Sequence, residues 1–387
     1  MAESPSTSKP TFNRKNPLIA HLPRRRFLSE GAAEKQTWHL EIDLQDSGLS
    51  YTPGDSLAVL PTNESSIVDE IIAALGLTGD ESVIAPDKST DVLRTVLSKQ
   101  CVITLVDKKF LAKLVEKAGD AAAEISALLA PEKKKELSDY LWGRETIDFL
   151  LMFPELKWEA QEFVSVLKKL NIRLYSISSS LAAVPNQVHL TIASVIYNSF
   201  GRERKGVCST FLNERCDENT DIPCFVTPGK GFRLPAADDD TPIIMCGPGT
   251  GIAPFRAFLQ ERHATQAKGD AWLFFGEIHQ ETCYFYQEEW ESYLADGTLN
   301  RITTAFSRDQ DHKIYVHHRM LEEGAQLWSW LERGAIFYVC GDAERMANDV
   351  DQALHQIAIE HGGKSEQEAA EYIEQMRQDK RYRRDVY

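Results

Sequence analysis

One stretch, from Thr241 to Phe258, constrains the fold of this chain more than any other. It opens with a short apolar run, TPIIMC, which is typical of a strand buried on both faces of a parallel sheet. A glycine-rich turn follows Cys246, and Pro254 stands where the first turn of a helix is expected. A buried strand, a glycine turn and a helix in this order predict a doubly wound α/β domain.

The glycine turn also indicates a ligand. Gly247, Gly249 and Gly251 would let the backbone approach a phosphate, and the following helix would present free N–H groups to it. No glycine stands in the third place of the G-x-G-x-x-G pattern, so the motif of ordinary NAD dehydrogenases does not account for the turn. We interpret it as a cradle for a pyrophosphate; a plain strand-to-helix turn is the alternative.

Strand and helix patterns divide the rest of the chain. Three further apolar runs, AWLFFG, RITTAF and AIFYVCG, continue the parallel sheet. Near the N-terminus, Trp38, Leu40 and Ile42 alternate with polar residues as in a half-buried strand. Helical spacing runs from Asn63 to about Leu170, and strand patterns return with RLYSI and QVHLTIASVIY. We therefore expect a β-rich part, split by a helical insertion, ahead of the α/β domain.

Composition and charge exclude several functions. A formal net charge of -15 and a pI near 5.2 argue against nucleic-acid binding, which needs a basic surface. No apolar run approaches the roughly 18 residues of a membrane span, and MAESPSTSKP resembles neither a secretory signal nor a transit peptide. The seven cysteines include no C-x-x-C pair and no cluster at zinc spacing. We expect reduced thiols, no metal and a cytoplasmic location.

Four more polar segments are candidate sites. The stretch from Arg173 to Ser180 joins a guanidinium, an aromatic ring and four serines where a core strand would be apolar. The loop FSRDQDHKIYVH offers two cations, a hydroxyl and a ring, which suit the 2′-phosphate of NADPH; a solvated loop is the alternative. Cys340 ends a buried strand, where it has either a chemical role or the role of a small side chain in packing. The C-terminal segment RYRRDVY has the composition of a solvated tail.

Six segments, in the same order and at similar spacing, resemble the FAD- and NADPH-binding module of the diflavin reductases, and among these most the sulfite reductase flavoproteins. They are RLYS, GVCSTFL, CGPGTGIAPFRAF, FSRDQDHKIYV, YVCGDAERMANDV and RYRRDVY. The resemblance implies an FAD-binding antiparallel β-barrel with a helical insertion, then a doubly wound parallel-sheet NADP-binding domain. The implied boundaries are a disordered lead-in at 1–15, the barrel at 16–65 and 171–236, the insertion at 66–170 and the NADP-binding domain at 240–387.

The resemblance also implies site residues. Arg173 would bind the FAD pyrophosphate, Tyr175 would pack on the isoalloxazine, and Tyr387 would cover the flavin face that the nicotinamide must occupy. Ser176, Cys340 and Asp385 would form the catalytic polar set around the hydride transfer. The FAD-binding residues would be Thr104, Arg173, Leu174, Tyr175, Ser176, Thr191, Ile192, Ala193, Tyr197, Gly206, Val207, Cys208, Ser209 and Tyr387. The NADPH-binding residues would be Thr250, Ser307, Arg308, Lys313, Tyr315, His317 and Asp349, where His317 replaces a glutamine of the family pattern.

The family pattern usually places an FMN-binding domain ahead of the FAD module. Fewer than twenty residues precede the first similar segment here, so we expect FAD and NADPH as cofactors and no FMN in this chain. The implied activity is an NADPH-dependent flavoprotein reductase, with a separate FMN carrier or a sirohaem iron–sulfur sulfite reductase subunit as electron acceptor. A ferredoxin- or flavodoxin-NADP reductase is the enzyme alternative, and a non-catalytic flavin-bearing assembly subunit is the alternative outside enzymes.

Overall fold

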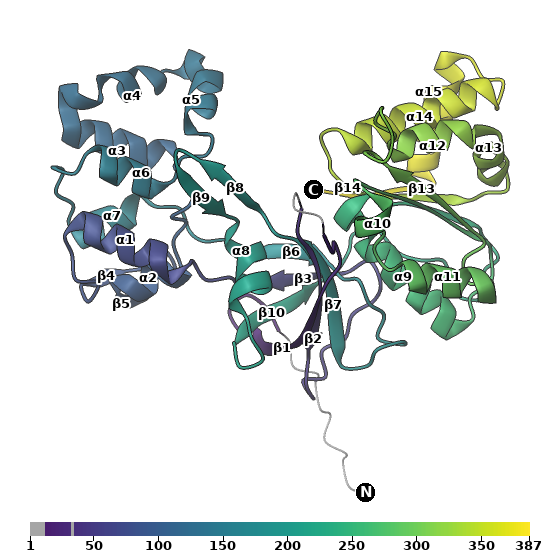
Figure 1. Ribbon diagram of the computed structural model, residues 1–387, viewed down its shortest axis with the longest axis horizontal. Helices are drawn as coiled ribbons and strands as arrows, with labels where there is room; N and C mark the ends of the chain where they lie inside the picture. Colours follow the sequence, from purple (N-terminus) through teal and green to yellow (C-terminus); the bar gives the residue numbers. More distant parts are fainter. Residues whose placement is uncertain (1–11, 32–34) are drawn as a thin grey trace, which may run out of the picture. The chain divides into compact units, whose positions relative to one another are not determined.

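The computed structural model describes residues 12–31 and 35–387 (Figure 1). Most of the expected lead-in at 1–15 lies outside the described residues, and its end forms a turn in which Asn13 and Asn16 exchange backbone hydrogen bonds. The chain forms two compact units. Unit 1 contains the residues up to Val59, together with Leu174–Ala193 and Cys216–Tyr387. Unit 2 contains Leu60–Arg173 and Ser194–Arg215.

An antiparallel sheet forms the first part of unit 1. Within the described residues its strand order is β6-β3-β10-β1-β2-β7. One bridge, between Ile177 just after β6 and Leu190 in β7, joins the two edge strands and closes the sheet into a barrel. The strands are β1 (Leu18–Phe27), β2 (Thr37–Asp43), β3 (Ser56–Val59), β6 (Arg173–Ser176), β7 (Gln187–Ala193) and β10 (Ile222–Thr227).

A parallel sheet forms the second part of unit 1. Across the part of the chain that the structure describes, its order is β13-β12-β11-β14-β15. Its strands are β11 (Ile243–Cys246), β12 (Ala271–Glu277), β13 (Arg301–Phe306), β14 (Ile336–Gly341) and β15 (Tyr382–Val386). The connecting helices are η4 (Gly249–Ile252), α9 (Ala253–Thr265), α10 (Gln280–Cys283), α11 (Gln287–Asp296), α12 (Val316–Glu322), α13 (Gly324–Glu332), α14 (Met346–Glu360) and α15 (Glu366–Gln378).

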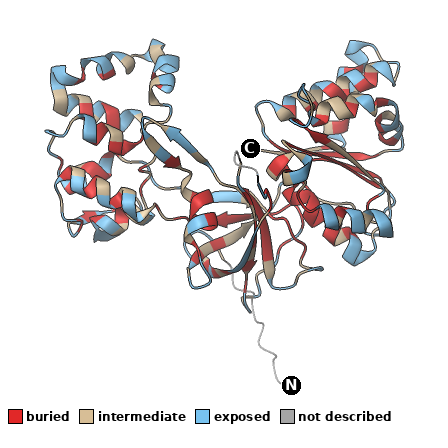
Figure 2. Ribbon diagram, viewed as in Figure 1, coloured by how far each residue is buried: buried red, intermediate tan, exposed pale blue. Residues whose placement is uncertain are grey.

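Side chains of the parallel sheet alternate between two cores. Ile243 and Met245 of β11 pack into one cluster with Phe255 of α9, whereas Ile244 and Cys246 pack into a second cluster built with α12, α13, α14 and α15. Every residue of β11, β12 and β14 is buried (Figure 2). Helices therefore cover both faces of the sheet, and the expected fold class, a barrel followed by a doubly wound sheet, is confirmed.

The C-terminal segment corrects one interpretation. RYRRDVY has the composition of a solvated tail, but Tyr382–Val386 forms β15, which pairs in parallel with β14. Tyr382 is buried against Phe337, and the backbone bonds of the sheet hold the charged residues around it in place. Because the strand lies at the edge of the sheet, its side chains need little apolar character.

Unit 2 contains the helical insertion. Phe110, Phe149, Trp158 and Phe163 pack together at its core, with the rings of Phe110 and Trp158 stacked 5.7 Å apart. Its helices are α1 (Ser65–Leu75), α2 (Leu93–Lys99), α3 (Lys108–Ala118), η1 (Gly119–Ala122), α4 (Ala123–Leu128), η2 (Pro131–Lys133), α5 (Lys134–Leu141), α6 (Thr146–Met152), α7 (Ala160–Val166), α8 (Val207–Thr210) and η3 (Phe211–Arg215). Its strands form two hairpins, β4 (Ser82–Ile84) with β5 (Thr90–Val92), and β8 (Ile196–Ser199) with β9 (Arg202–Lys205).

Two further properties concern the described residues of both units. No helix among them combines the length and the apolar character needed to cross a bilayer. All seven cysteines are buried and form no disulfide.

A buried charge cluster ties β9 to α6 inside unit 2. Arg204 is 1% exposed and donates to both carboxylate oxygens of Asp148, at 2.8 and 2.7 Å, and to Glu145 at 3.3 Å. One guanidinium therefore faces two carboxyl groups. Burial raises the pKa of Glu145 to about 7, with Arg204 opposing the shift and Asp148 adding to it. Glu145 thus retains its proton well above the pH at which an exposed glutamate loses it.

This cluster predicts a pH-dependent stability. The folded-state pKa of Glu145 is raised from 4.5 to about 7, so the stabilisation is complete below pH 4.5 and is lost as the pH rises through 7. We expect Glu145→Gln to remove this dependence, which amounts to about 3 kcal/mol at roughly 1.4 kcal/mol per pH unit. Urea unfolding at several pH values, followed by tryptophan fluorescence, measures it. Glu132→Gln, at an exposed position, is the control; a constant difference between Glu145→Gln and the wild type would contradict the prediction.

Candidate functional site

The strand that carries RLYS contributes a hydroxyl to the centre of unit 1. Arg173 and Leu174 are exposed, and Tyr175 and Ser176 are half-buried. Ser176 Oγ donates a hydrogen bond of 2.8 Å to Asp385 Oδ2, although the two residues are 209 positions apart. The last strand of the parallel sheet therefore meets the strand predicted to hold the flavin.

Cys340 completes this polar set. The parallel register of β14 and β15 makes Cys340 and Asp385 direct partners, and the thiol donates to the same carboxylate oxygen over 3.9 Å. Burial, and then the charge of Asp385, raises the pKa of Cys340 far above its usual range, so the thiol stays protonated. The structure thus brings together the three predicted catalytic residues, as two proton donors around one carboxylate.

The glycine turn lies at the carboxyl end of β14. Gly249 has φ +59°, and a Cβ at Gly251 would lie 2.2 Å from the carbonyl oxygen of Cys340. No side chain larger than hydrogen fits there, so the backbone of the turn packs directly on the strand that carries Cys340. Thr250 Oγ1 lies 2.9 Å from the hydroxyl of Tyr387, a residue that is 64% exposed. Two predicted cofactor residues, one from the turn and one from the C-terminus, are therefore neighbours.

The predicted 2′-phosphate loop follows β13 at the same edge of the sheet. Ser307 is buried, and its N–H donates to the carbonyl of Glu277. Arg308, Lys313 and Tyr315 are exposed to solvent. Two cations at the carboxyl edge of a parallel sheet suit an anionic group of a nucleotide.

His317 lies at the end of this loop and belongs to a small network. Its Nε2 is 3.1 Å from Nε2 of His318, and its Nδ1 is 3.8 Å from Asp349 Oδ2. Since Nδ1 of His318 accepts the N–H of Tyr315, Nε2 of a neutral His318 carries the proton and donates to His317. Burial, and then the nearby His318, lowers the pKa of His317. The predicted adenosine residue and the predicted nicotinamide residue Asp349 are thus adjacent.

Strand β7 supplies the other predicted flavin residues of unit 1, Thr191, Ile192 and Ala193. Thr191 is buried, and its Oγ1 lies 2.6 Å from the hydroxyl of Tyr286, which precedes α11. The barrel strand is therefore hydrogen-bonded to the nucleotide-binding part of the same unit.

Unit 2 carries the remaining predicted FAD residues. Val207, Cys208 and Ser209 form most of α8, and Thr104 lies in the loop before α3. A Cβ at Gly206 would lie 2.8 Å from both Ser209 Oγ and Val195 Cβ, so this turn needs glycine. Tyr197 is 38% exposed, and its ring centroid is 5.7 Å from that of the exposed Trp142. A tight turn beside exposed rings fits a dinucleotide in chemical character.

Sequence reasoning missed one charged pair at the nucleotide loop. Glu277 ends β12, and its nearly buried carboxylate lies 2.6 Å from Nζ of Lys35. A Cβ at Gly249 would lie 3.0 Å from this Nζ and 3.3 Å from Glu277 Oε1, which places the pair beside the turn. The available signal was the acidic residue that ends the otherwise apolar run AWLFFGE.

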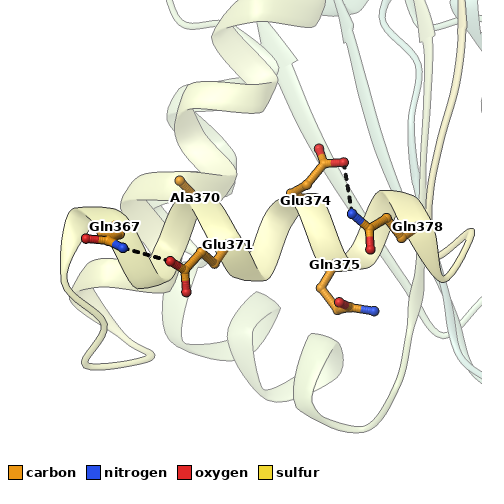
Figure 3. A pocket seen from close by; sticks show the side chains of 6 residues that line it. All are labelled: Gln367, Ala370, Glu371, Glu374, Gln375 and Gln378. Carbon is orange, nitrogen blue, oxygen red and sulfur yellow. Dashed lines mark hydrogen bonds between the residues drawn. The ribbon is translucent and has the colours of Figure 1, made fainter.

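A shallow depression on α15 is not part of this site. Figure 3 shows that its lining comes from one exposed helix face, where Gln367 donates to Glu371 and Gln378 to Glu374. It contains none of the predicted cofactor residues, and exposed amide–carboxylate pairs of this kind are ordinary surface contacts.

The closed barrel and the parallel sheet with its glycine turn define a protein built to hold two nucleotide cofactors. A family profile described as "FAD binding domain" matches residues 10–211, and one described as "Oxidoreductase NAD-binding domain" matches residues 245–352. The first match covers more than half of the chain, which therefore belongs to the FAD binding domain family.

Several similar proteins share one name. The chain is 43% identical to the "Sulfite reductase [NADPH] flavoprotein alpha-component" of Bacillus subtilis (strain 168) over 100% of its own length and 64% of the relative. The proteins of the same name from Shewanella sp. (strain ANA-3) and Photorhabdus laumondii are 44% and 43% identical over 98% and 97% of this chain and 62% of each relative. The chain thus spans less than two thirds of these relatives.

The contact between the turn and β14 predicts a selective defect. In Gly251→Ala the new methyl group collides with the carbonyl of Cys340, so the turn must move away from β14. We expect NADPH binding to weaken at least about tenfold, since a displaced turn would lose the backbone contacts that we predict it makes to the ligand, while FAD content stays unchanged. Isothermal titration with NADP⁺ and the flavin absorbance of the purified protein measure the two quantities.

The matched control is Gly297→Ala. Gly297 has φ +82°, unlike Gly251, and its added Cβ meets no atom within 4 Å, so the control reports a strained alanine that makes no collision. Equal NADP⁺ affinities for Gly251→Ala and the wild type would show that the turn does not hold the nucleotide.

Proposed function

We propose that this chain is the NADPH-dependent reductase module of an FAD flavoprotein. The observation that carries the proposal is the contact of Ser176, Cys340 and Asp385, which joins the flavin-type strand to the nucleotide-binding sheet within one unit. The matches to an FAD binding domain and an oxidoreductase NAD-binding domain support the two cofactors.

The chemistry belongs to the cofactors and the positioning to the chain. When both are bound, the nicotinamide of NADPH gives a hydride, two electrons with one proton, to the flavin, and NADP⁺ remains. Asp385 accepts from Ser176 and Cys340, so this carboxylate can orient both donors toward the reacting rings. Tyr387 is tethered near the nucleotide loop through Thr250, and we propose that its ring covers the flavin and moves aside for nicotinamide.

The relatives support a particular electron acceptor. They are named as NADPH sulfite reductase flavoproteins, and we propose that this chain passes electrons toward a sirohaem iron–sulfur sulfite reductase subunit, with an FMN carrier between them. Seven buried cysteines that form no disulfide support our expectation of a reducing, cytoplasmic location.

A reduction assay tests the proposed function. The purified chain, reconstituted with FAD, is mixed with NADPH in a stopped-flow spectrometer, and bleaching of the flavin is recorded. We expect one FAD per chain, no FMN, and reduction of ferricyanide but not of sulfite, because six-electron reduction needs a haem centre that no cysteine cluster here could bind. Failure of NADPH to bleach the flavin would refute the proposal, and sulfide made by the chain alone would refute the need for a partner.

Coenzyme preference is the more specific test. NADH lacks the 2′-phosphate of NADPH but would make the other proposed contacts of this site. Because Arg308 and Lys313 supply positive charge for the phosphate, we expect a strong preference for NADPH. Arg308→Ala should weaken NADPH binding by about 1.5–3 kcal/mol, the worth of one charge-assisted contact, and leave NADH binding almost unchanged.

The preference is measured as the ratio of kcat/KM for NADPH and NADH. Lys230→Ala removes an exposed lysine that lies outside the proposed site and is the control. Equal use of the two coenzymes by the wild type would contradict the assignment of the 2′-phosphate loop.

A further inference from the structure

Three serines of the stretch Arg173 to Ser180 are not used by the proposed chemistry. Ser176 bonds to Asp385, but Ser178, Ser179 and Ser180 are fully buried beyond it. Ser179 stays within the barrel, where its hydroxyl lies 2.7 Å from that of Tyr51. Ser178 and Ser180 instead contact α9, the helix that begins directly after the nucleotide loop.

The first contact comes from the first turn of α9. Arg256 is only 6% exposed, and its Nε and Nη2 donate to the carboxylate of Glu289 in α11, at distances of 2.8 to 3.1 Å. Its Nη1 points the other way, donating to the carbonyl of Ser178 at 2.8 Å and to Nδ1 of His189 at 3.2 Å. Burial, and then the charge of Arg256, lowers the pKa of His189 to about 3, so the imidazole is neutral and its Nδ1 can accept.

The second contact lies one turn further along α9. The backbone N–H of Ser180 donates to Oε1 of Gln260 at 3.0 Å, and the Ser180 hydroxyl donates to the carboxylate of Glu261. We call the set Ser178, Ser180, His189, Arg256, Gln260 and Glu261 the α9 clamp. Two turns of one helix are thus hydrogen-bonded to barrel residues that begin two positions after Ser176.

The clamp fixes a position because its central group is charged and buried. A buried guanidinium without acceptors is strongly destabilising, and two of the three residues that accept from Arg256, Ser178 and His189, belong to the barrel. The helix therefore has one position on the barrel in which both hydrogen bonds of Nη1 can form. A shift of the helix by about 1 Å away from the barrel would stretch both bonds beyond normal hydrogen-bond lengths.

We propose that Arg256 is a positioning residue for hydride transfer, which holds the nucleotide loop in register with the flavin strand through the α9 clamp. This inference rests on the proposed function and adds a role for a buried residue that is not among the predicted cofactor-binding residues. Its physical basis is the steep dependence of hydride transfer on the distance and angle of the two rings, since a misplacement of about 1 Å can cost roughly 10²-fold in rate.

Tyr286 forms a second link of the same kind. Its ring lies 4.6 Å from the guanidinium carbon of Arg256, and its hydroxyl contacts Thr191 of β7 at 2.6 Å and Nδ1 of His39 at 3.0 Å. His39, Glu41 and His189 lie close enough to share a cation. His189, however, uses both ring nitrogens, with Arg256 and with Gln187, and the guanidinium repels a cation, so we assign the cluster to the link between the sheets.

The test uses the FAD-loaded chain and stopped-flow reduction by NADPH. Four variants weaken the α9 clamp or its second link by different routes: Arg256→Leu, Arg256→Lys, Ser180→Ala and Tyr286→Phe. The last three are mild enough to keep the protein folded. Arg262→Leu is the matched control, because Arg262 is a buried arginine of the same helix whose guanidinium, among the described residues, bonds to the carbonyls of Lys268 and Gly269 and not to the barrel. The readouts are the limiting rate of flavin reduction, the dissociation constant of NADPH, FAD content and the charge-transfer absorbance.

We expect Arg256→Leu to lower the limiting rate at least about tenfold and to weaken the charge-transfer absorbance, while the dissociation constant changes less than about threefold. Arg256→Lys, Ser180→Ala and Tyr286→Phe should show smaller losses of the same kind, and Arg262→Leu none. Rates equal to those of the control, or losses found only in NADPH affinity, would overturn the inference and leave the proposed function intact. If the wild type itself is not reduced by NADPH, the proposed function has failed instead.

Discussion

Parallel pairing of β15 with β14 is the interaction on which the site depends. It sets Asp385 opposite Cys340, brings a carboxylate to the hydroxyl of Ser176, and leaves Tyr387 beside Thr250 of the nucleotide loop. None of these contacts is local in sequence. A central strand and an edge strand, each held by backbone hydrogen bonds, therefore assemble a constellation that side-chain attraction alone would not form.

Buried charge fixes the geometry around this constellation. Arg256 binds acceptors in the barrel and on helix α11, Lys35 meets the nearly buried Glu277 at the nucleotide loop, and Arg204 is enclosed by Glu145 and Asp148 in unit 2. Such pairs add little net stability, because the cost of desolvation offsets their attraction. Their contribution is to select one packing arrangement. In that arrangement each buried charge has its hydrogen-bond partners, and in any other it would be buried without them.

The sequence predicted most of the elements but few of the contacts between them. Apolar runs identified β11, β12, β13 and β14, and alternation identified β2, because both patterns follow from local burial. The same alternation could not show that His39, on the opposite face of β2, is buried under Tyr286. Strand β1, with three arginines after its proline, has no clear apolar period, and β15 is strongly charged, so only pairing with a neighbour reveals either as a strand. The grouping of the predicted catalytic residues came from family resemblance and not from local pattern.

Complete burial of the cysteines has a practical consequence. All seven cysteines are buried, and burial raises the pKa of Cys101 and Cys224 to about 12, so these two thiols stay protonated at neutral pH. Because no cysteine is exposed, the surface of the folded protein offers no thiol to maleimide and nitroxide reagents. A single cysteine introduced on each unit would carry a fluorophore or spin label, and the distribution of distances between the labels would measure the separation of the two units with and without NADPH.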